Sequence, residues 1–189
     1  MTAIIGLLRE EHQNIDKLLR ILEQELAVFE CGERPDYDLL QAIIGYFQAY
    51  PDHCHHPKED IVFEALRQRD PAMAEAIADI EDEHRHEAAR LRRFALIVES
   101  IQVDHEVLRQ TFSGAVRDFI AYQRKHLEKE ERFLFPAALK ALLPEDWAAI
   151  DARLTCGRDP LFSSAAEDEY HDLRQRLLQW EEENQAERV

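Results

Sequence analysis

Apolar side chains recur at steps of three and four residues along most of the chain, a spacing typical of helices that bury one face. The first run covers about residues 2–29, and Gly32 and Pro35 end it. We expect one long helix here. Its buried stripe also carries a histidine, and comprises Ile5, Leu8, His12, Ile15, Leu19, Leu22 and Leu26.

The second run begins at about Leu39 and reaches Leu66. Pro51 and Pro57 lie inside it, and a proline removes one backbone donor and crowds the preceding turn. We therefore expect a kink or a short break between two helical parts.

Two more long runs follow. Asp70 and Pro71 have the pattern of a helix N-cap with a proline at the first helical position, and this third helix ends near residues 101–104. The fourth covers about residues 105–142 and stops before Pro144. Its mostly inward side chains are Phe112, Val116, Phe119, Tyr122, His126, Glu130, Phe133 and Leu134.

These runs predict an all-α protein, an up-down-up-down four-helix bundle over residues 1–143. Residues 144–189 predict a C-terminal helical appendage packed on the bundle, with a last helix at about 165–187. Its apolar side chains could cover the bundle, which we favour, or pair with a second chain, so both monomer and homodimer stay open. They are Tyr170, Leu173, Leu177, Leu178 and Trp180.

Charge and composition narrow the class of partner. The 39 acidic side chains outnumber the 23 basic ones and give a net charge of −16, which opposes binding to nucleic acid or to an anionic membrane. No stretch approaches the roughly 18 apolar residues of a membrane span. We expect a cytoplasmic protein with three free thiols, because Cys31, Cys54 and Cys156 include no CxxC pair.

An internal repeat carries the candidate chemistry. Glu83-His84 follows Glu11-His12 by 72 residues, and the segment His126–Glu130 follows His55–Glu59 by 71 residues. Two helical hairpins of one design, joined head to tail, predict a bundle with approximate twofold symmetry.

In each HxxxE segment the histidine and the glutamate are one helical turn apart on one face. Each half adds another histidine, so four imidazoles and two carboxylates converge in the core, a set that suits iron and also accepts manganese or zinc. A lone buried histidine is more often a hydrogen-bonded core residue, but six matched positions favour a metal site. The predicted ligands are His12, His55, Glu59, His84, His126 and Glu130, with Glu59 and Glu130 as bridges.

These residues resemble the hemerythrin-like, or HHE cation-binding, family over about residues 3–143. The order H, HxxxE, H, HxxxE matches, and the phrases YPDHCHHPKEDIVFEAL and HLEKEERFLFPAAL are similar to family wording around the ligands. The resemblance implies a four-helix bundle that holds two non-haem iron ions, bridged by two carboxylates and an oxo or hydroxo group.

One departure from the family's oxygen carriers concerns the third helix. The carriers have a fifth histidine one turn after the ligand of that helix, and here Ala88 stands in its place. One iron would then have an open position, which the neighbouring Glu87 could fill unless it is a surface group or a partner of a ligand.

Other side chains near the motifs have weaker claims. His56 is about 100° round a helix from His55, so we expect it beside the ligands or exposed. The Tyr122 hydroxyl could approach a bound oxygen species, or could belong to an ordinary core tyrosine. We expect the remaining histidines at the surface: His53, His86, His105 and His171.

Three functions remain open at this point. The first is binding or sensing of O2, NO or iron itself, and the second is an oxidant-stress enzyme that turns over hydrogen peroxide or NO-derived species at the same centre. The missing fifth histidine argues against a dedicated oxygen carrier. The third is a metal-free helical interaction module.

Overall fold

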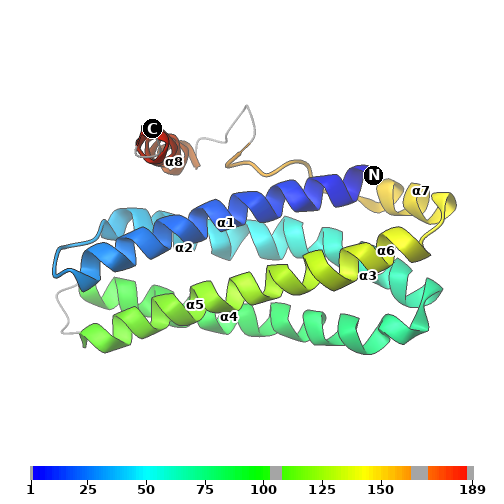
Figure 1. The fold of residues 1–189 in the computed structure, drawn as a ribbon, viewed down its shortest axis with the longest axis horizontal. Coiled ribbons are helices and arrows are strands. Elements are labelled where there is room, and N and C mark those ends of the chain that lie inside the picture. Colours follow the sequence, from blue (N-terminus) through cyan, green and yellow to red (C-terminus); the bar gives the residue numbers. More distant parts are fainter. Residues whose placement is uncertain (1, 103–107, 163–169, 187–189) are drawn as a thin grey trace.

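The computed structural model describes residues 2–102, 108–162 and 170–186 (Figure 1). Four long helical segments run alternately up and down. The first is α1 (Ala3–Glu30), and the second joins α2 (Tyr37–Tyr50) to α3 (His56–Arg69) through a π-helical turn at Pro51–His55. A 3-10 turn at Pro71–Met73 leads into the third, α4 (Ala74–Gln102).

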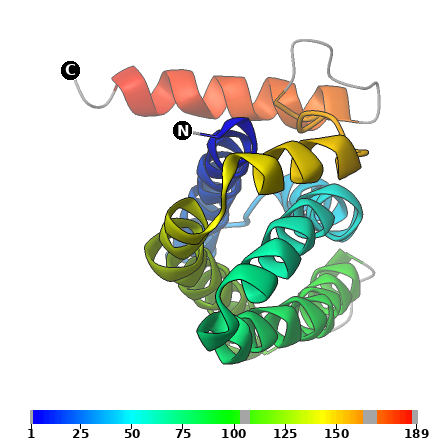
Figure 2. The same cartoon turned by 90° about the vertical axis from the view of Figure 1, so that its right-hand side faces the viewer.

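The fourth segment is α5 (Arg109–Lys129), a second π-helical turn at Glu130–Leu134, and α6 (Phe135–Ala141). Seen along its axis, the bundle is a ring of four segments, with α4 packed on α5 and α2, and α1 packed on α5 (Figure 2). The prediction of an all-α four-helix bundle is confirmed. Among the described residues, no helix has the length and apolar character needed to cross a membrane.

The expected break at the prolines is replaced by the π-helical turn. The backbone stays helical from Tyr37 to Arg69, with Pro51 at the first position of the turn, where the wider hydrogen-bonding ring tolerates a missing N–H donor. The second π-helical turn corrects another expectation. Phe133 lies inside it and is exposed, because the inserted residue changes which side chains face the core; Phe135 points inward instead, and Leu134 is buried as predicted.

The core consists of two apolar clusters separated along the bundle axis. One cluster gathers side chains of α3, α4 and α6 around the first turns of α1, including Ile5, Leu8, Val62, Phe63 and Phe135. The other fills the bundle around the later turns of α1, including Leu19, Leu22, Phe47, Phe94 and Phe119. Between them lies a layer of buried histidine and glutamate side chains.

The C-terminal part adds two helices. At one end of the bundle, α7 (Pro144–Arg153) packs on α3, and Arg69 donates to both carboxylate oxygens of Asp146 at 2.7 and 2.9 Å. The last helix, α8 (His171–Ala186), crosses the outside of the bundle rather than following its axis, and it contacts α2 (Figures 1 and 2). Tyr170, Leu173 and Leu177 are buried there, whereas Leu178 is 48% exposed.

The prediction of three free thiols is wrong. Cys54 and Cys156 form a disulfide with their Cα atoms 5.5 Å apart, and only Cys31 is free among the described cysteines. The two half-cystines are 102 residues apart, and they meet because the segment after α7 returns along the bundle to the π-helical turn. That segment is held as well by Tyr46, whose hydroxyl donates to Asp159 at 2.7 Å. Because two of the three cysteines form a disulfide, the cysteines no longer support the prediction of a cytoplasmic protein.

Candidate metal centre

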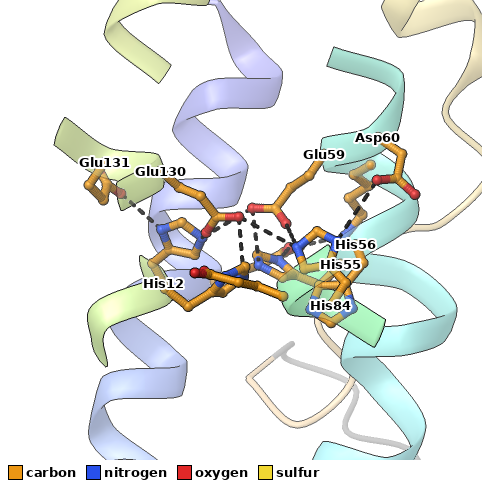
Figure 3. Close-up of polar contacts among 12 residues, drawn as sticks. His12, His55, His56, Glu59, Asp60, His84, Glu130 and Glu131 are labelled. Atoms are coloured by element: carbon orange, nitrogen blue, oxygen red, sulfur yellow. Dashed lines mark hydrogen bonds and ion pairs between the residues drawn. The ribbon is translucent and has the colours of Figure 1, made fainter. Parts of the chain in front are cut away.

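All six predicted ligands meet in the polar layer, and each long helical segment contributes. Figure 3 labels five of them, all except His126. Glu59 and Glu130 are fully buried, and at most 10% of any of the four histidine side chains is exposed. Two groups of potential ligand atoms lie within 4.8 Å of one another, namely those of His12, His55 and Glu59, and those of His56, Glu59, His84 and His126.

Glu59 belongs to both groups. Its Oε1 atom lies 3.3 Å from Nε2 of His12 and 3.3 Å from Nε2 of His55. Its Oε2 atom lies 3.6 Å from Nε2 of His84. One carboxylate thus faces histidines of both halves of the repeat.

Glu130 has the same relation to the two halves. Its Oε2 atom lies 3.4 Å from Nε2 of His12, and its Oε1 atom lies 3.2 Å from Nε2 of His126 and 3.6 Å from Nε2 of His84. The two carboxylates point toward each other between the rings (Figure 3). This is the arrangement that two bridging carboxylates require.

Many polar atoms of this layer have no hydrogen-bond partner. Buried polar groups in proteins are nearly always hydrogen-bonded, and each unsatisfied one costs about 1–3 kcal/mol. Imidazole nitrogens and carboxylate oxygens around one point are also the donor set of a transition-metal ion, so these residues fit a metal centre. The unpartnered atoms are Nε2 of His55, His84 and His126, Oε2 of Glu59 and Glu87, and both oxygens of Glu130.

Carboxylates outside the cluster fix the orientation of the histidines. His55 Nδ1 donates to Glu11 Oε2 at 2.8 Å, and His126 Nδ1 donates to Glu83 Oε2 at 3.1 Å. A histidine whose Nδ1 carries the proton presents a bare Nε2 lone pair to a metal. Glu11 and Glu83 are equivalent in the internal repeat, so both halves orient this ligand alike.

The other two histidines also have a carboxylate beside Nδ1, but only that of His12 is within hydrogen-bond distance. His12 Nδ1 lies 3.1 Å from Glu131 Oε1, and His84 Nδ1 lies 3.9 Å from Asp60 Oδ1 (Figure 3). Glu131 and Asp60 each come directly after a candidate bridging glutamate. The repeat therefore includes a carboxylate for each of the four imidazoles, which the ligand spacing alone did not reveal.

A buried lysine supports one of these carboxylates. Lys58 is 2% exposed, and its Nζ donates to Glu11 Oε1 at 2.5 Å and to the Tyr50 hydroxyl at 3.0 Å. Tyr50 in turn donates to Glu11 at 2.8 Å. In the other half Lys129 donates to Glu83, but its side chain is one-third exposed.

The environment sets the charge of two histidines differently. Burial lowers the pKa of His55 to about 3, so its imidazole is neutral, the form that binds a metal. Burial also acts on His12, but hydrogen bonds to Glu131 and Glu59 and the charge of Glu130 outweigh it and raise the pKa to about 10. In the absence of a cation, a proton on His12 partly compensates the buried carboxylates.

His56 lies within the cluster, so of its two expected places the one beside the ligands is the one found. It is 7% exposed, and its ring stacks on His84 with centroids 3.9 Å apart. Its Nδ1 lies 3.3 Å from Asp52 Oδ1 and its Nε2 3.4 Å from Glu87 Oε2. The signal for this position was the proline pair, since the π-helical turn at Pro51–His55 changes the register of the residues around it.

Glu87 contacts a histidine of the cluster, whereas the Tyr122 hydroxyl bonds to the backbone. Glu87 is buried, accepts a hydrogen bond from Gln123 Nε2 at 2.5 Å and contacts His56, so it is no surface group. The Tyr122 hydroxyl donates to the backbone carbonyl of Glu83 at 2.5 Å, which favours the ordinary core tyrosine over a partner of a bound oxygen species. Ala88 lines a surface groove.

The peripheral histidines are at the surface where the structure describes them. His53, His86 and His171 are exposed, as predicted, and His105 lies outside the described residues.

Two surface grooves reach the layer, and each lies between a helix of the first half of the repeat and a helix of the second. One, of about 590 Å³, lies between α1 and α5, includes His12 and Leu127, and is lined by Arg9, Arg20 and Arg124 among others. The other, of about 590 Å³, lies between α3 and α4 and includes His56 and His84 with Asp52 and Asp60. Of the three histidines that line the grooves, His12 and His84 belong to the predicted ligand set.

Comparison with known proteins agrees with this geometry. The family model of the hemerythrin HHE cation-binding domain matches residues 3–138, which include all six predicted ligands. No curated protein and no solved structure matches the chain. The fold, the buried cluster of histidines and glutamates and this match lead to one conclusion: the chain belongs to the hemerythrin HHE cation-binding domain family.

Proposed function

We propose that the chain is a non-haem di-iron protein that binds or senses a small ligand, either O2 or NO, or iron itself. The observation that carries the proposal is the set of unpartnered imidazole and carboxylate atoms converging in a buried layer of the bundle. Without a cation these groups are costly to bury, and with one they become ligands. The protein atoms that would hold the ions belong to His12, His55, Glu59, His84, His126 and Glu130.

The distances suggest how the residues divide between two ions. His12 and His55 would hold one ion and His84 and His126 the other, while Glu59 and Glu130 would bridge them. Ferrous iron in such a site supplies electrons and an exchangeable coordination position to O2 or NO.

The remaining residues keep the site ready for binding. The apolar clusters on both sides exclude water along the bundle axis, and carboxylates bonded to Nδ1 of His55 and His126 hold these imidazoles with Nε2 inward. The groove at His12 gives a small molecule a short path from solvent to one half of the site.

The same groove supports a second candidate, an oxidant-stress enzyme that turns over hydrogen peroxide or NO-derived species. The groove is lined by charged side chains of both signs, including Arg9, Arg124 and Glu128, so a polar reactant such as hydrogen peroxide and its products could exchange through it.

Optical spectroscopy of the iron-loaded protein separates these functions. The protein is reduced without oxygen and then exposed to O2, NO or H2O2 in separate samples. A stable, ligand-dependent absorption band supports binding, and repeated consumption of added peroxide supports the enzyme. A spectrum that none of the three changes contradicts both and leaves the metal-free interaction module.

A further inference from the structure

We infer that His56 is a fifth histidine ligand, which binds the ion beside His84 and His126 and makes the two halves of the site unequal. This inference rests on the proposed two-metal centre. It assigns to α3 the ligand that the third long helix lacks at Ala88.

The internal repeat shows where the symmetry is broken. The segments HHPKED and HLEKEE are equivalent, so His56 corresponds to Leu127, and Glu87 on α4 corresponds to Ile15 on α1. Beside His84 the chain therefore places an imidazole and a carboxylate, and beside His12 it places two aliphatic side chains. A layer with only structural histidines would have no need for this polar pair in one half.

The position of His56 suits coordination. Its ligand atom lies within 4.8 Å of those of Glu59, His84 and His126, all four of one another. Two nitrogen or oxygen ligands about 2.1 Å from one ion are about 3.0–4.2 Å apart, depending on the angle between them. The four atoms need only a small inward movement to reach these separations.

A neighbouring carboxylate would hold the ring in place. Asp52 Oδ1 lies 3.3 Å from its Nδ1, which leaves Nε2 for the ion, and Glu87 Oε2 lies 3.4 Å from that Nε2, a separation that suits two ligands of one ion. Asp52 then plays the part that Glu11 and Glu83 play for two other histidines. Glu87 Oε2 has no hydrogen-bond partner, so it is available to the same ion or to a group bound there.

A consequence concerns the other ion. Ile15 and Leu127 have no ligand atom, so the ion beside His12 and His55 would keep the free position. That half is also the one that the groove lined by His12 and Leu127 reaches. A small ligand would therefore bind on the His12 side.

Proton NMR of the Co(II)-loaded full-length protein tests the assignment. Each imidazole bound through one nitrogen shows one solvent-exchangeable N–H signal with a large paramagnetic shift. We expect two Co(II) ions and five such signals per chain, with one signal lost in His56→Leu, which copies the Leu127 side of the repeat. We also expect His56→Leu to weaken Co(II) in chelator competition by at least about tenfold.

His53→Leu is the matched control, because His53 is two residues before His55 but exposed, and it should leave both readouts unchanged. Two ions with only four signals in the unaltered protein would overturn the role of His56 and leave the two-metal centre intact. That count needs no variant, so it decides even if His56→Leu fails to fold. Fewer than two ions would overturn both proposals.

Discussion

Glu11 and His55, 44 residues apart in the chain, form a buried pair in which Glu11 Oε2 lies 2.8 Å from His55 Nδ1. Because Glu11 holds Nδ1, Nε2 of His55 faces the buried layer of histidine and glutamate side chains. Such outer partners of metal-binding histidines typically contribute about 10–100-fold to affinity. We expect Glu11→Gln to lower the affinity for Co(II) or Zn(II) by this factor, measured by competition with a chromogenic chelator.

The neighbouring Glu10 offers a control for that experiment, since it is exposed on the same helix. Glu10→Gln makes the same chemical change and should leave the affinity unaltered. Equal affinities of Glu11→Gln and the unaltered protein would mean that the buried pair does not support a ligand.

We expect Lys58 to stabilise the folded state although it is not a candidate metal ligand. Its ammonium lies against Glu11 and Tyr50, so Lys58→Met leaves a buried carboxylate without its cation. Loss of one partner of a buried ion pair costs about 3–5 kcal/mol. Urea unfolding of the metal-free variant measures this loss in the free energy of unfolding.

Lys129→Met tests whether burial is the cause. Lys129 pairs with Glu83 in the equivalent place, but one-third of its side chain is exposed, so we expect a loss of no more than about 1 kcal/mol. Similar losses in the two variants would contradict the explanation by burial.

The disulfide between Cys54 and Cys156 makes a direct prediction about thiol content. Protein denatured without a reductant should react with one equivalent of a thiol reagent, through Cys31, and after reduction with three. Reduction should also lower the free energy of unfolding by about 2–4 kcal/mol. Three reactive thiols before reduction would show that the two half-cystines are not joined.

Attachment of the C-terminal segment should depend on pH through Asp159. Burial raises the pKa of its carboxyl, although the Tyr46 hydroxyl and the Leu161 N–H donate to it. A carboxyl with a higher pKa in the folded state stabilises the fold at low pH and loses this contribution as the pH rises through that pKa.

Asp159→Asn keeps an acceptor for Tyr46 but cannot ionise. Between pH 4 and 8, the unfolding free energy of Asp159→Asn relative to the unaltered protein should therefore increase with pH. A difference that stays constant, or that decreases, would contradict the raised pKa.

The sequence predicted the bundle and the convergence of its six candidate ligands because both depend on helical period and on an internal repeat. His12, His55 and Glu59 lie on faces that an ordinary helix places inward, and their equivalents repeat the pattern. The carboxylates Glu11 and Glu83 occupy equivalent positions in that repeat, but their role became clear only from their distances to Nδ1.

The features that the sequence did not predict arise where the chain departs from a regular helix, or where segments far apart in the sequence come into contact. The two π-helical turns moved Phe133 outward and accompany the burial of His56, and no residue count based on 100° per residue includes them. The disulfide and the contact between Tyr46 and Asp159 join segments more than 100 residues apart. Such pairings follow from the path of the chain after α7, which local periodicity does not determine.

The measurement that tests the central claim most directly is the iron content of protein loaded and isolated without oxygen, compared with Glu59→Gln and Glu130→Gln. Each carboxylate faces histidines of both halves, so each should matter to both ions. We predict close to two irons per chain in the unaltered protein and fewer than one in the variant that carries both substitutions. One iron or none in the unaltered protein, or two in the double variant, would contradict a centre bridged by Glu59 and Glu130.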